Sequence, residues 1–225
     1  MKKRFFVTGT DTDAGKTYVT VGLLNAAKRA GLKSLGIKPI AAGAVSIEGK
    51  LRNDDALLIQ AASSVSLPYE QVNPVVLEAA VAPHIAAIQE GRLVTASRLE
   101  GYIKGALLMP HELALVEGAG GWRVPLNDRE MLSDVAKSLG FPVILVVNMK
   151  LGCLNHAVLT AEAIARDGLI LAGWVANTGP EKMPFFEENV ATLSAMLPAP
   201  LLTTLSWCDS GEEAQSQFDE LLSAL

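Results

Sequence analysis

The feature that most constrains the fold of this chain is a glycine loop near its N-terminus, Gly9-Thr10-Asp11-Thr12-Asp13-Ala14-Gly15-Lys16-Thr17. It follows the apolar run Phe5-Phe6-Val7 and precedes a helix-like stretch from Tyr18 to Ala30. Strand, glycine loop and helix together are typical of a phosphate-binding loop, whose backbone N–H groups and helix N-terminus bind phosphate oxygens. We expect Lys16 to reach the β- and γ-phosphates of a nucleotide, and Thr17 to offer its hydroxyl to Mg²⁺.

The spacing of this loop differs from the common one, because the usual first glycine position holds Thr10 and Gly9 lies one residue earlier. The alternative interpretation is a structural glycine turn that carries an incidental Lys-Thr pair. Agreement among strand, loop and helix favours phosphate binding. The loop lacks the GxGxxG fingerprint, which disfavours a nicotinamide cofactor.

Composition narrows the class of protein. The chain has 225 residues, of which 50% are hydrophobic and 19% charged, so it can bury a full core. Its net charge of −5 argues against non-specific nucleic-acid binding. The longest apolar runs are too short for a membrane span, and the N-terminus lacks the pattern of a signal peptide. The cysteines Cys153 and Cys208 show no metal-ligand spacing, which predicts a reduced, cytoplasmic protein.

Short apolar runs alternate with helical patterns along the chain, and no linker interrupts them. We therefore expect one α/β domain over residues 1–225 of the P-loop NTPase type, with a doubly wound, mostly parallel sheet and helices on both faces. The predicted strands are Phe5–Thr8, Leu35–Lys38, Leu113–Glu117, Val143–Asn148, Leu171–Asn177 and Leu201–Leu205. The predicted helices are Lys16–Ala30, Asp54–Ala62, Ala96–Leu108, Leu132–Leu139, Asn155–Asp167, Phe185–Leu197 and Glu212–Leu225. We expect Gly43–Leu51 and Ser63–Pro83 to be loops.

Four charged residues lie at the ends of predicted strands, where ligands bind in parallel sheets, or at the start of a predicted helix. Lys38 ends a predicted apolar strand and either extends to solvent or stabilises charge on a transferring phosphoryl group. Asp54 and Asp55 open a helix, where a capping role competes with a role for Asp55 as a Mg²⁺ ligand. Glu117 ends a buried strand before a glycine run; it is either a solvated turn residue or a metal ligand.

Two further segments have alternative interpretations. Asn177 ends a strand, and it suits either an adenine edge or a simple turn. Gly152 to His156 begins a helix whose free N–H groups can bind an anion. We expect Cys153 to be a packed residue, because no activating base is evident, and the sequence shows no Ser-His-Asp arrangement.

With these motifs in place, the chain resembles the dethiobiotin synthetase family. The resemblance covers nearly the whole chain. It is carried by Val7–Thr12 with Gly15-Lys16-Thr17, Lys38-Pro39, Gly49, Leu51-Arg52-Asn53 with Asp55, Asn73-Pro74, Pro83-His84-Ile85, Val116–Trp122, Leu151–His156, Gly173–Asn177 and Pro198–Leu201.

The resemblance implies a homodimeric enzyme that converts 7,8-diaminopelargonic acid, CO₂ and MgATP to dethiobiotin, ADP and phosphate. A carbamate of the substrate amine is phosphorylated to a mixed anhydride, and the neighbouring amine closes the ring. It also implies site residues. Lys16 and Lys38 are catalytic, and Thr17, Asp55 and Glu117 hold Mg²⁺. The nucleotide is bound by Asp13, Ala14, Gly15, Lys16, Thr17, Tyr18, Asp55, Glu117, Gly118, Ala119, Gly120, Asn177, Thr178, Ser206, Trp207, Cys208 and Glu213. The substrate is bound by Thr12, Lys38 and, from the partner subunit, Gly152, Cys153, Leu154 and Asn155.

The chain departs from the family pattern at three places. Ala42 stands where the family has a substrate-binding serine, Asp13 replaces a glutamate, and Thr203–Cys208 replaces a Gly-Glu-Ile-Pro-like segment. Two other functions remain as alternatives. One is an amide ligase of the cobyrinic-acid type, which usually carries an added glutaminase domain. The other is a partitioning-type ATPase switch, which usually has an extra lysine early in the loop.

Overall fold

A six-stranded parallel sheet forms the centre of the protein in a computed structural model that describes residues 2–179, 182–206 and 211–225. The strand order is β10-β9-β8-β1-β7-β2, so β1 lies inside the sheet between β7 and β8. The six strands are β1 (Lys3–Gly9), β2 (Ser34–Ile37), β7 (Leu113–Glu117), β8 (Val143–Asn148), β9 (Leu171–Asn177) and β10 (Leu201–Leu205). Every pairing within this sheet is parallel.

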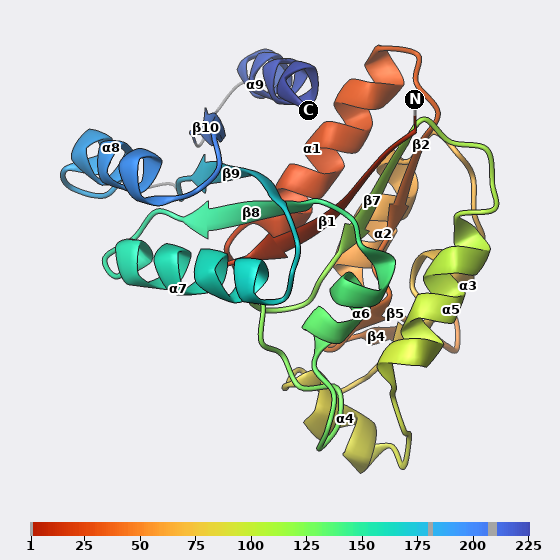
Figure 1. Cartoon of the computed structure of the whole chain (residues 1–225). Coiled ribbons are helices and arrows are strands. Elements are labelled where there is room, and N and C mark those ends of the chain that lie inside the picture. Colours follow the sequence, from red (N-terminus) through yellow and green to blue (C-terminus); the bar gives the residue numbers. More distant parts are fainter. Residues whose placement is uncertain (1, 180–181, 207–210) are drawn as a thin grey trace.

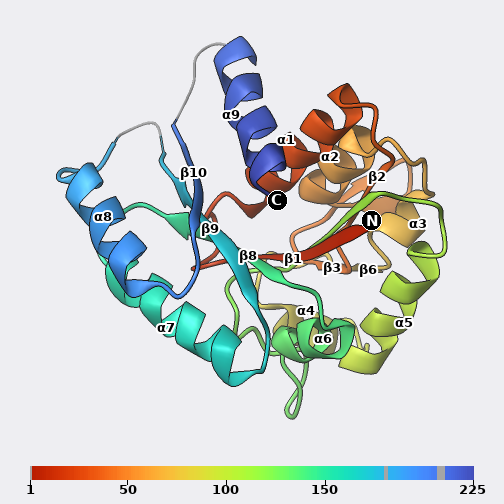
Figure 2. The same cartoon turned by 45° about the horizontal axis from the view of Figure 1, so that its top comes forward.

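Helices cover both faces of this sheet (Figures 1 and 2). One face carries α1 (Lys16–Arg29), α2 (Asp54–Ala62) and α9 (Gly211–Ala224). The other carries α5 (Ala96–Ala106), α6 (Leu132–Leu139), α7 (Cys153–Arg166) and α8 (Phe186–Met196). The predicted doubly wound α/β fold is therefore confirmed, and the ends of its main elements lie within about two residues of the predicted ones.

The surroundings of β8 explain why its residues 143–147 are all apolar. Ile144 and Val146 belong to the larger hydrophobic cluster, whereas Leu145 and Val147 pack with α7 and α8 in a second cluster. Successive side chains of a strand point to opposite faces, so a sheet covered on both sides needs an apolar residue at every position.

The two segments expected to be loops contain short regular elements, so that prediction was wrong in detail. Within Gly43–Leu51 begins an antiparallel hairpin of β4 (Val45–Ile47) and β5 (Lys50–Arg52). Within Ser63–Pro83 lie α3 (Tyr69–Val72) and β6 (Val75–Val76), which pairs with β3 (Ile40–Ala41), and α4 (Pro83–Gln89) begins. These pieces are too short for a hydrophobic period to reveal them.

Among the described residues, no helix is both long enough and apolar enough to cross a bilayer.

The contact between α1 and α9 depends on Gly22. A Cβ atom placed on Gly22 would lie 2.3 Å from ring carbons of Phe218, a side chain that is only 4% exposed. Since real Cβ atoms do not approach so closely, the Gly22→Ala variant has to displace the Phe218 ring or the whole of α9. We expect the free energy of unfolding to fall by about 1–3 kcal/mol, as in other overpacked cores.

The matched control is Gly101→Ala in the middle of α5, where the added methyl group meets nothing within 4 Å. There alanine should stabilise the helix by about 0.5–1 kcal/mol. Urea unfolding of both variants tests the prediction. Equal effects of the two substitutions would contradict the close α1–α9 contact.

Candidate functional site

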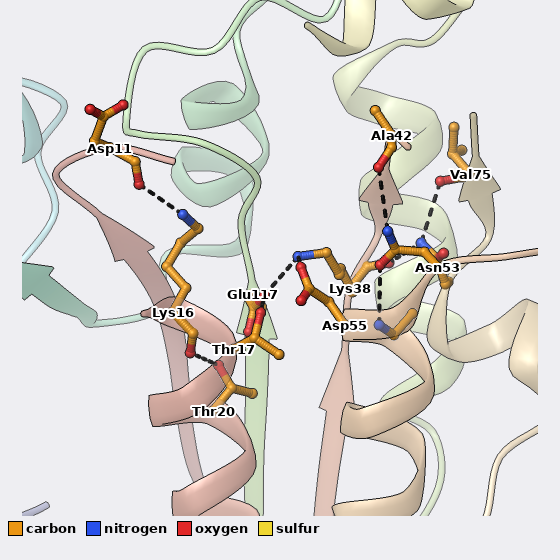
Figure 3. Close-up of polar contacts among 12 residues, drawn as sticks. Asp11, Lys16, Thr17, Thr20, Lys38, Ala42, Asn53, Asp55, Val75 and Glu117 are labelled. Atoms are coloured by element: carbon orange, nitrogen blue, oxygen red, sulfur yellow. Dashed lines mark hydrogen bonds and ion pairs between the residues drawn. The ribbon is translucent and has the colours of Figure 1, made fainter. Parts of the chain in front are cut away.

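The glycine loop connects β1 to α1, as expected, and its backbone is unusually bent. Asp13 has a φ of 58° and Gly15 a φ of 93°, both in the left-handed region. Lys16 is 7% exposed, and its Nζ folds back to donate to the carbonyl oxygen of Asp11 at 3.0 Å (Figure 3). The lysine thus lies across the concave side of the loop, where a phosphate group would bind.

A cluster of charged groups lies next to the loop and joins three parts of the chain. Lys38 Nζ lies 2.7 Å from Glu117 Oε1 and 2.9 Å from Asp55 Oδ2, and Thr17 Oγ1 donates to Glu117 Oε1 at 2.7 Å (Figure 3). Glu117 is fully buried and Lys38 is 4% exposed, whereas the Asp55 side chain is 45% exposed. The strand order explains this meeting, because β7 lies between β1 and β2 and ends at the same edge of the sheet.

The pKa values of Lys16 and Lys38 are shifted in opposite directions. Burial lowers the pKa of Lys16, and the positive charge of Lys38 lowers it further. Burial also acts to lower the pKa of Lys38, but the attraction and hydrogen bonds of Glu117 and Asp55 outweigh it, so the pKa of Lys38 is raised. Lys38 is therefore a firmly protonated counter-ion for the buried carboxylate, as an ion pair out of water requires.

Lys38 itself is held by a chain of hydrogen bonds that the sequence analysis did not identify. Asn73 Nδ2 donates to the Lys38 carbonyl oxygen at 2.6 Å, and Tyr69 Oη donates to Asn73 Oδ1 at 2.9 Å. The backbone N–H of Asn53 donates to Tyr69 Oη at 2.8 Å, and the Asn53 side chain caps α2, which carries Asp55. One chain of polar contacts therefore positions both the lysine and the aspartate.

This arrangement corrects two details of the sequence analysis. Strand β2 ends at Ile37, so Lys38 lies one residue beyond the strand, and its N–H donates to Val72 instead of a sheet neighbour. The N-cap of α2 is Asn53, and Asp54 occupies only the first turn. The Asn73-Pro74 pair, which the resemblance includes, was the one sequence feature that pointed to this chain of hydrogen bonds. No sequence feature pointed to Tyr69.

An open cleft of about 900 Å³ lies over the loop. Its walls include residues 11–13 and 15–18 of the loop, Lys38, Asp55, residues 80–83 before and at the start of α4, and residues 119–121. The glycines after β7 allow this shape. Gly120 has a φ of 61°, and a side chain at position 118 would come close to the Phe6 ring. Thr12, Tyr18 and Ala42 also line the cleft.

The residues around Glu117 fit a magnesium ion. Glu117 Oε2 is buried and has no hydrogen-bond partner, which is costly for a carboxylate oxygen unless a further group satisfies it. Thr17 adds a hydroxyl oxygen and Asp55 a partly exposed carboxylate next to the cleft. The described residues contain no cluster of three or more acidic, His or Cys ligands. Two carboxylates and a hydroxyl suit Mg²⁺, which takes its other ligands from phosphate and water.

The predicted adenine-binding residues lie on the other side of the loop. Asn177 ends β9, and its Nδ2 donates to the carbonyl oxygen of Ala14 in the loop at 3.0 Å. Thr178 follows, with its hydroxyl donating to Leu205, and Ser206 comes directly after β10. Trp207 and Cys208 lie outside the described residues, as does the side chain of Glu213.

The predicted carboxylate-binding segment does not join this cleft. Gly152 is the N-cap of α7 with a φ of 95°, and Leu151 before it is 95% exposed. None of Gly152, Cys153, Leu154 and Asn155 is among the described residues that line the cleft. The Cys153 N–H donates to Lys150, which leaves fewer free donors than predicted, and burial raises the pKa of its thiol. Cys153 is therefore a packed residue and not an activated nucleophile.

Comparisons with known proteins agree with this geometry. A family model described as an AAA domain matches residues 3–215. The chain is 59% identical over 201 residues to a protein of Cellvibrio japonicus named ATP-dependent dethiobiotin synthetase BioD, covering 89% of this chain and 88% of that protein. It is 51% identical over 215 residues to the protein of the same name from Marinobacter nauticus, covering 95% and 92%.

A solved structure also resembles the chain. The septum site-determining protein MinD from Pyrococcus horikoshii, complexed with Mg-ADP, matches with a TM-score of 0.58 at 17% identity and covers 99% of this chain and 95% of its own. At this identity the likeness shows the fold alone, which is that of P-loop nucleotide-binding proteins.

The ion pair between Lys38 and Glu117 yields a stability prediction. Lys38→Met leaves the buried Glu117 charge without its counter-ion, so we expect the free energy of unfolding in EDTA to fall by about 3–5 kcal/mol. Because the pKa of Lys38 is raised, this stabilisation is fully present below the unfolded-state pKa of about 10.4 and is lost as pH rises through the folded-state pKa. Urea unfolding at about pH 7.5 therefore measures the full effect.

The control for this measurement is Lys104→Met, which removes an exposed lysine from its pair with Glu100 on α5. That loss should be below about 0.5 kcal/mol. If Lys38→Met also cost less than about 1 kcal/mol, Glu117 would not be a buried charge that depends on Lys38.

Proposed function

The chain belongs to the family of ATP-dependent dethiobiotin synthetases, and we propose that its cleft performs that reaction in biotin biosynthesis. The substrates are 7,8-diaminopelargonic acid, CO₂ and ATP, and the products are dethiobiotin, ADP and phosphate. The observation that carries the proposal is the pair of buried lysines beside the phosphate loop, at the bottom of one cleft with two carboxylates. Such a site stabilises anionic charge during carboxylation and phosphoryl transfer.

The chemistry needs no covalent bond to the enzyme. A substrate amine takes up CO₂ to form a carbamate, and a carbamate oxygen attacks the γ-phosphorus of ATP with loss of ADP. The second amine then attacks the carbonyl carbon of this carbamic–phosphoric anhydride, releases phosphate and closes the ureido ring. The packed, protonated state of Cys153 is consistent with a mechanism that uses no protein nucleophile.

Each charged residue has a distinct task in this scheme. Lys16 reaches the β- and γ-phosphates once it leaves the carbonyl of Asp11, and Lys38 lies where it can neutralise the carbamate and the transferring phosphoryl group. Thr12 faces the same cleft and can bind the substrate. The nucleotide base would lie near Asn177, Thr178 and Ser206, together with the family-implied residues Trp207, Cys208 and Glu213.

Thr17, Asp55 and Glu117 would hold Mg²⁺, as the unpartnered Oε2 of Glu117 supports. When bound, the ion neutralises charge on the phosphates and orients the γ-phosphate for attack. The protein prepares for it by pairing the Glu117 carboxylate with Lys38 and by fixing Thr17 at the start of α1.

We further propose a homodimer in which the N-terminus of α7 from one subunit completes the cleft of the other and binds the substrate carboxylate. Leu151 is exposed, and Gly152 to Asn155 are not among the described residues that line their own cleft; both observations support this proposal. Residues 1–225 would act as one domain, since all six parallel strands share one sheet. The two cysteines without metal-ligand spacing favour a cytoplasmic location.

The proposal predicts one dethiobiotin for each ADP formed from 7,8-diaminopelargonate, bicarbonate and MgATP. Lys16→Ala should lower kcat/KM by roughly 10³ or more, about 4 kcal/mol of transition-state stabilisation, because the loop then lacks its charge on the transferring phosphate. Product analysis by mass spectrometry measures the ratio of dethiobiotin to ADP, and steady-state kinetics measure kcat/KM of the variant. Lys104→Ala on α5 should keep wild-type activity. ADP release without dethiobiotin would contradict the proposed reaction.

The dimer proposal predicts a mass near twice the 23.8 kDa of the chain in light scattering at working concentration. Leu154→Asp places a charge in the proposed subunit contact, so it should raise the KM for diaminopelargonate much more than the KM for ATP. A fully active monomer of 23.8 kDa would refute the shared site.

A further inference from the structure

The phosphate loop has carbonyl groups as well as N–H groups, and each of them needs a partner. When the N–H groups of such a loop turn toward a phosphate, the carbonyls turn toward the protein, where an unpaired one is costly. Three loop carbonyls accept hydrogen bonds from side chains here. Asp11 accepts from Lys16 Nζ at 3.0 Å, Ala14 from Asn177 Nδ2 at 3.0 Å, and Asp13 from Asn148 Nδ2 at 3.5 Å.

The two asparagines come from neighbouring strands and face the loop side by side. Asn148 ends β8, Asn177 ends β9, and they are direct partners in the register of these parallel strands. The backbone N–H of Asn148 also donates to Thr10 Oγ1 at 3.3 Å, while the Thr10 N–H donates to Val146 at 3.0 Å. The ends of β8 and β9 therefore support the outer side of the loop along much of its length.

The packing of Asn177 against the loop is close. A Cβ atom on Gly15 would lie 2.1 Å from Asn177 Nδ2, so the amide fits only because residue 15 has no side chain. Gly15 also adopts a φ of 93°, which favours glycine independently. The Asn177 backbone is fixed too, because its carbonyl accepts from the Met149 N–H at 2.9 Å.

We propose that Asn177, assisted by Asn148, is a positioning residue of the phosphate loop. Through this role it contributes to triphosphate binding independently of the base. The inference rests on the proposed function, in which the cleft binds ATP. Lys16 has to release Asp11 when it reaches the phosphates, so the Asn177–Ala14 bond is the strong side-chain anchor that persists in the nucleotide complex. The other N–H and Oδ1 of the same amide remain available for an adenine edge, so the two roles are compatible.

Inorganic tripolyphosphate separates loop positioning from base recognition, because it has no base. Isothermal titration in the presence of Mg²⁺ compares its affinity and that of ATP for wild type and Asn177→Ala. We expect Asn177→Ala to bind tripolyphosphate five- to tenfold more weakly, the loss of one hydrogen bond, and to bind ATP at least as much more weakly. Asn148→Ala should bind both ligands about two- to threefold more weakly than wild type, because the contact of Asn148 with the loop is longer.

The matched control is Asn189→Ala. Asn189 Nδ2 also donates to a backbone carbonyl, that of Phe185, but on the outer helix α8 (Figure 1). Both affinities of this variant should stay within twofold of wild type. Tripolyphosphate affinity within twofold of wild type in Asn177→Ala would overturn the proposal, whether or not ATP affinity falls. A wild-type chain that binds neither ligand would instead overturn the proposed function and the inference with it.

Hydrogen exchange of the ligand-free protein distinguishes a local change in the loop from a general loss of structure. In Asn177→Ala, amides of residues 13–17 should exchange at least tenfold faster than in wild type, while those of Ile144 and Val146 in β8 keep their rates. Equal acceleration in the loop and in β8 would show that the substitution only destabilises the fold, and unchanged loop rates would show that Asn177 does not hold the loop.

Discussion

The structure of the site depends on one buried carboxylate. Glu117 is fully buried at the end of β7, and an isolated charge there would cost several kcal/mol. The protein offsets this cost with the Lys38 ammonium at 2.7 Å and the Thr17 hydroxyl at 2.7 Å. These partners come from the segments after β2 and after β1, so the strand order is what brings them together. The remaining oxygen of Glu117 is then available to a metal ion.

Much of this could be predicted from the sequence. The apolar runs predicted the six parallel strands, whose carboxyl ends share an edge, and Thr17, Asp55 and Glu117 were expected to meet there as one Mg²⁺ site. The ion pair between Lys38 and Glu117 was not predicted. The polar chain through Tyr69 and Asn73 could not be predicted, because it depends on how a long, irregular segment folds back on the sheet. The contact of Asn177 with the loop was also missed, since a strand-end asparagine has the same sequence signal whether it faces a base or a carbonyl.

The fold and the function rest on different kinds of likeness. The MinD structure has the same architecture at 17% identity, which says nothing of a shared reaction. The relatives at 51% and 59% identity align with this chain over most of their length, and both are named as ATP-dependent dethiobiotin synthetases. We propose that the two buried lysines and the cleft bounded by residues 80–83 and 119–121 bind a small anionic substrate beside the nucleotide.

We propose that Glu117 binds the metal ion that accompanies the nucleotide, and the rest of the site is arranged around this carboxylate. The most direct test is the affinity for ATP with and without Mg²⁺, measured by titration calorimetry on wild type and Glu117→Gln. We expect Mg²⁺ to strengthen ATP binding by at least tenfold in wild type and by less than twofold in Glu117→Gln, while both proteins bind ATP alone with similar affinity. A variant that keeps the full Mg²⁺ enhancement would contradict the claim.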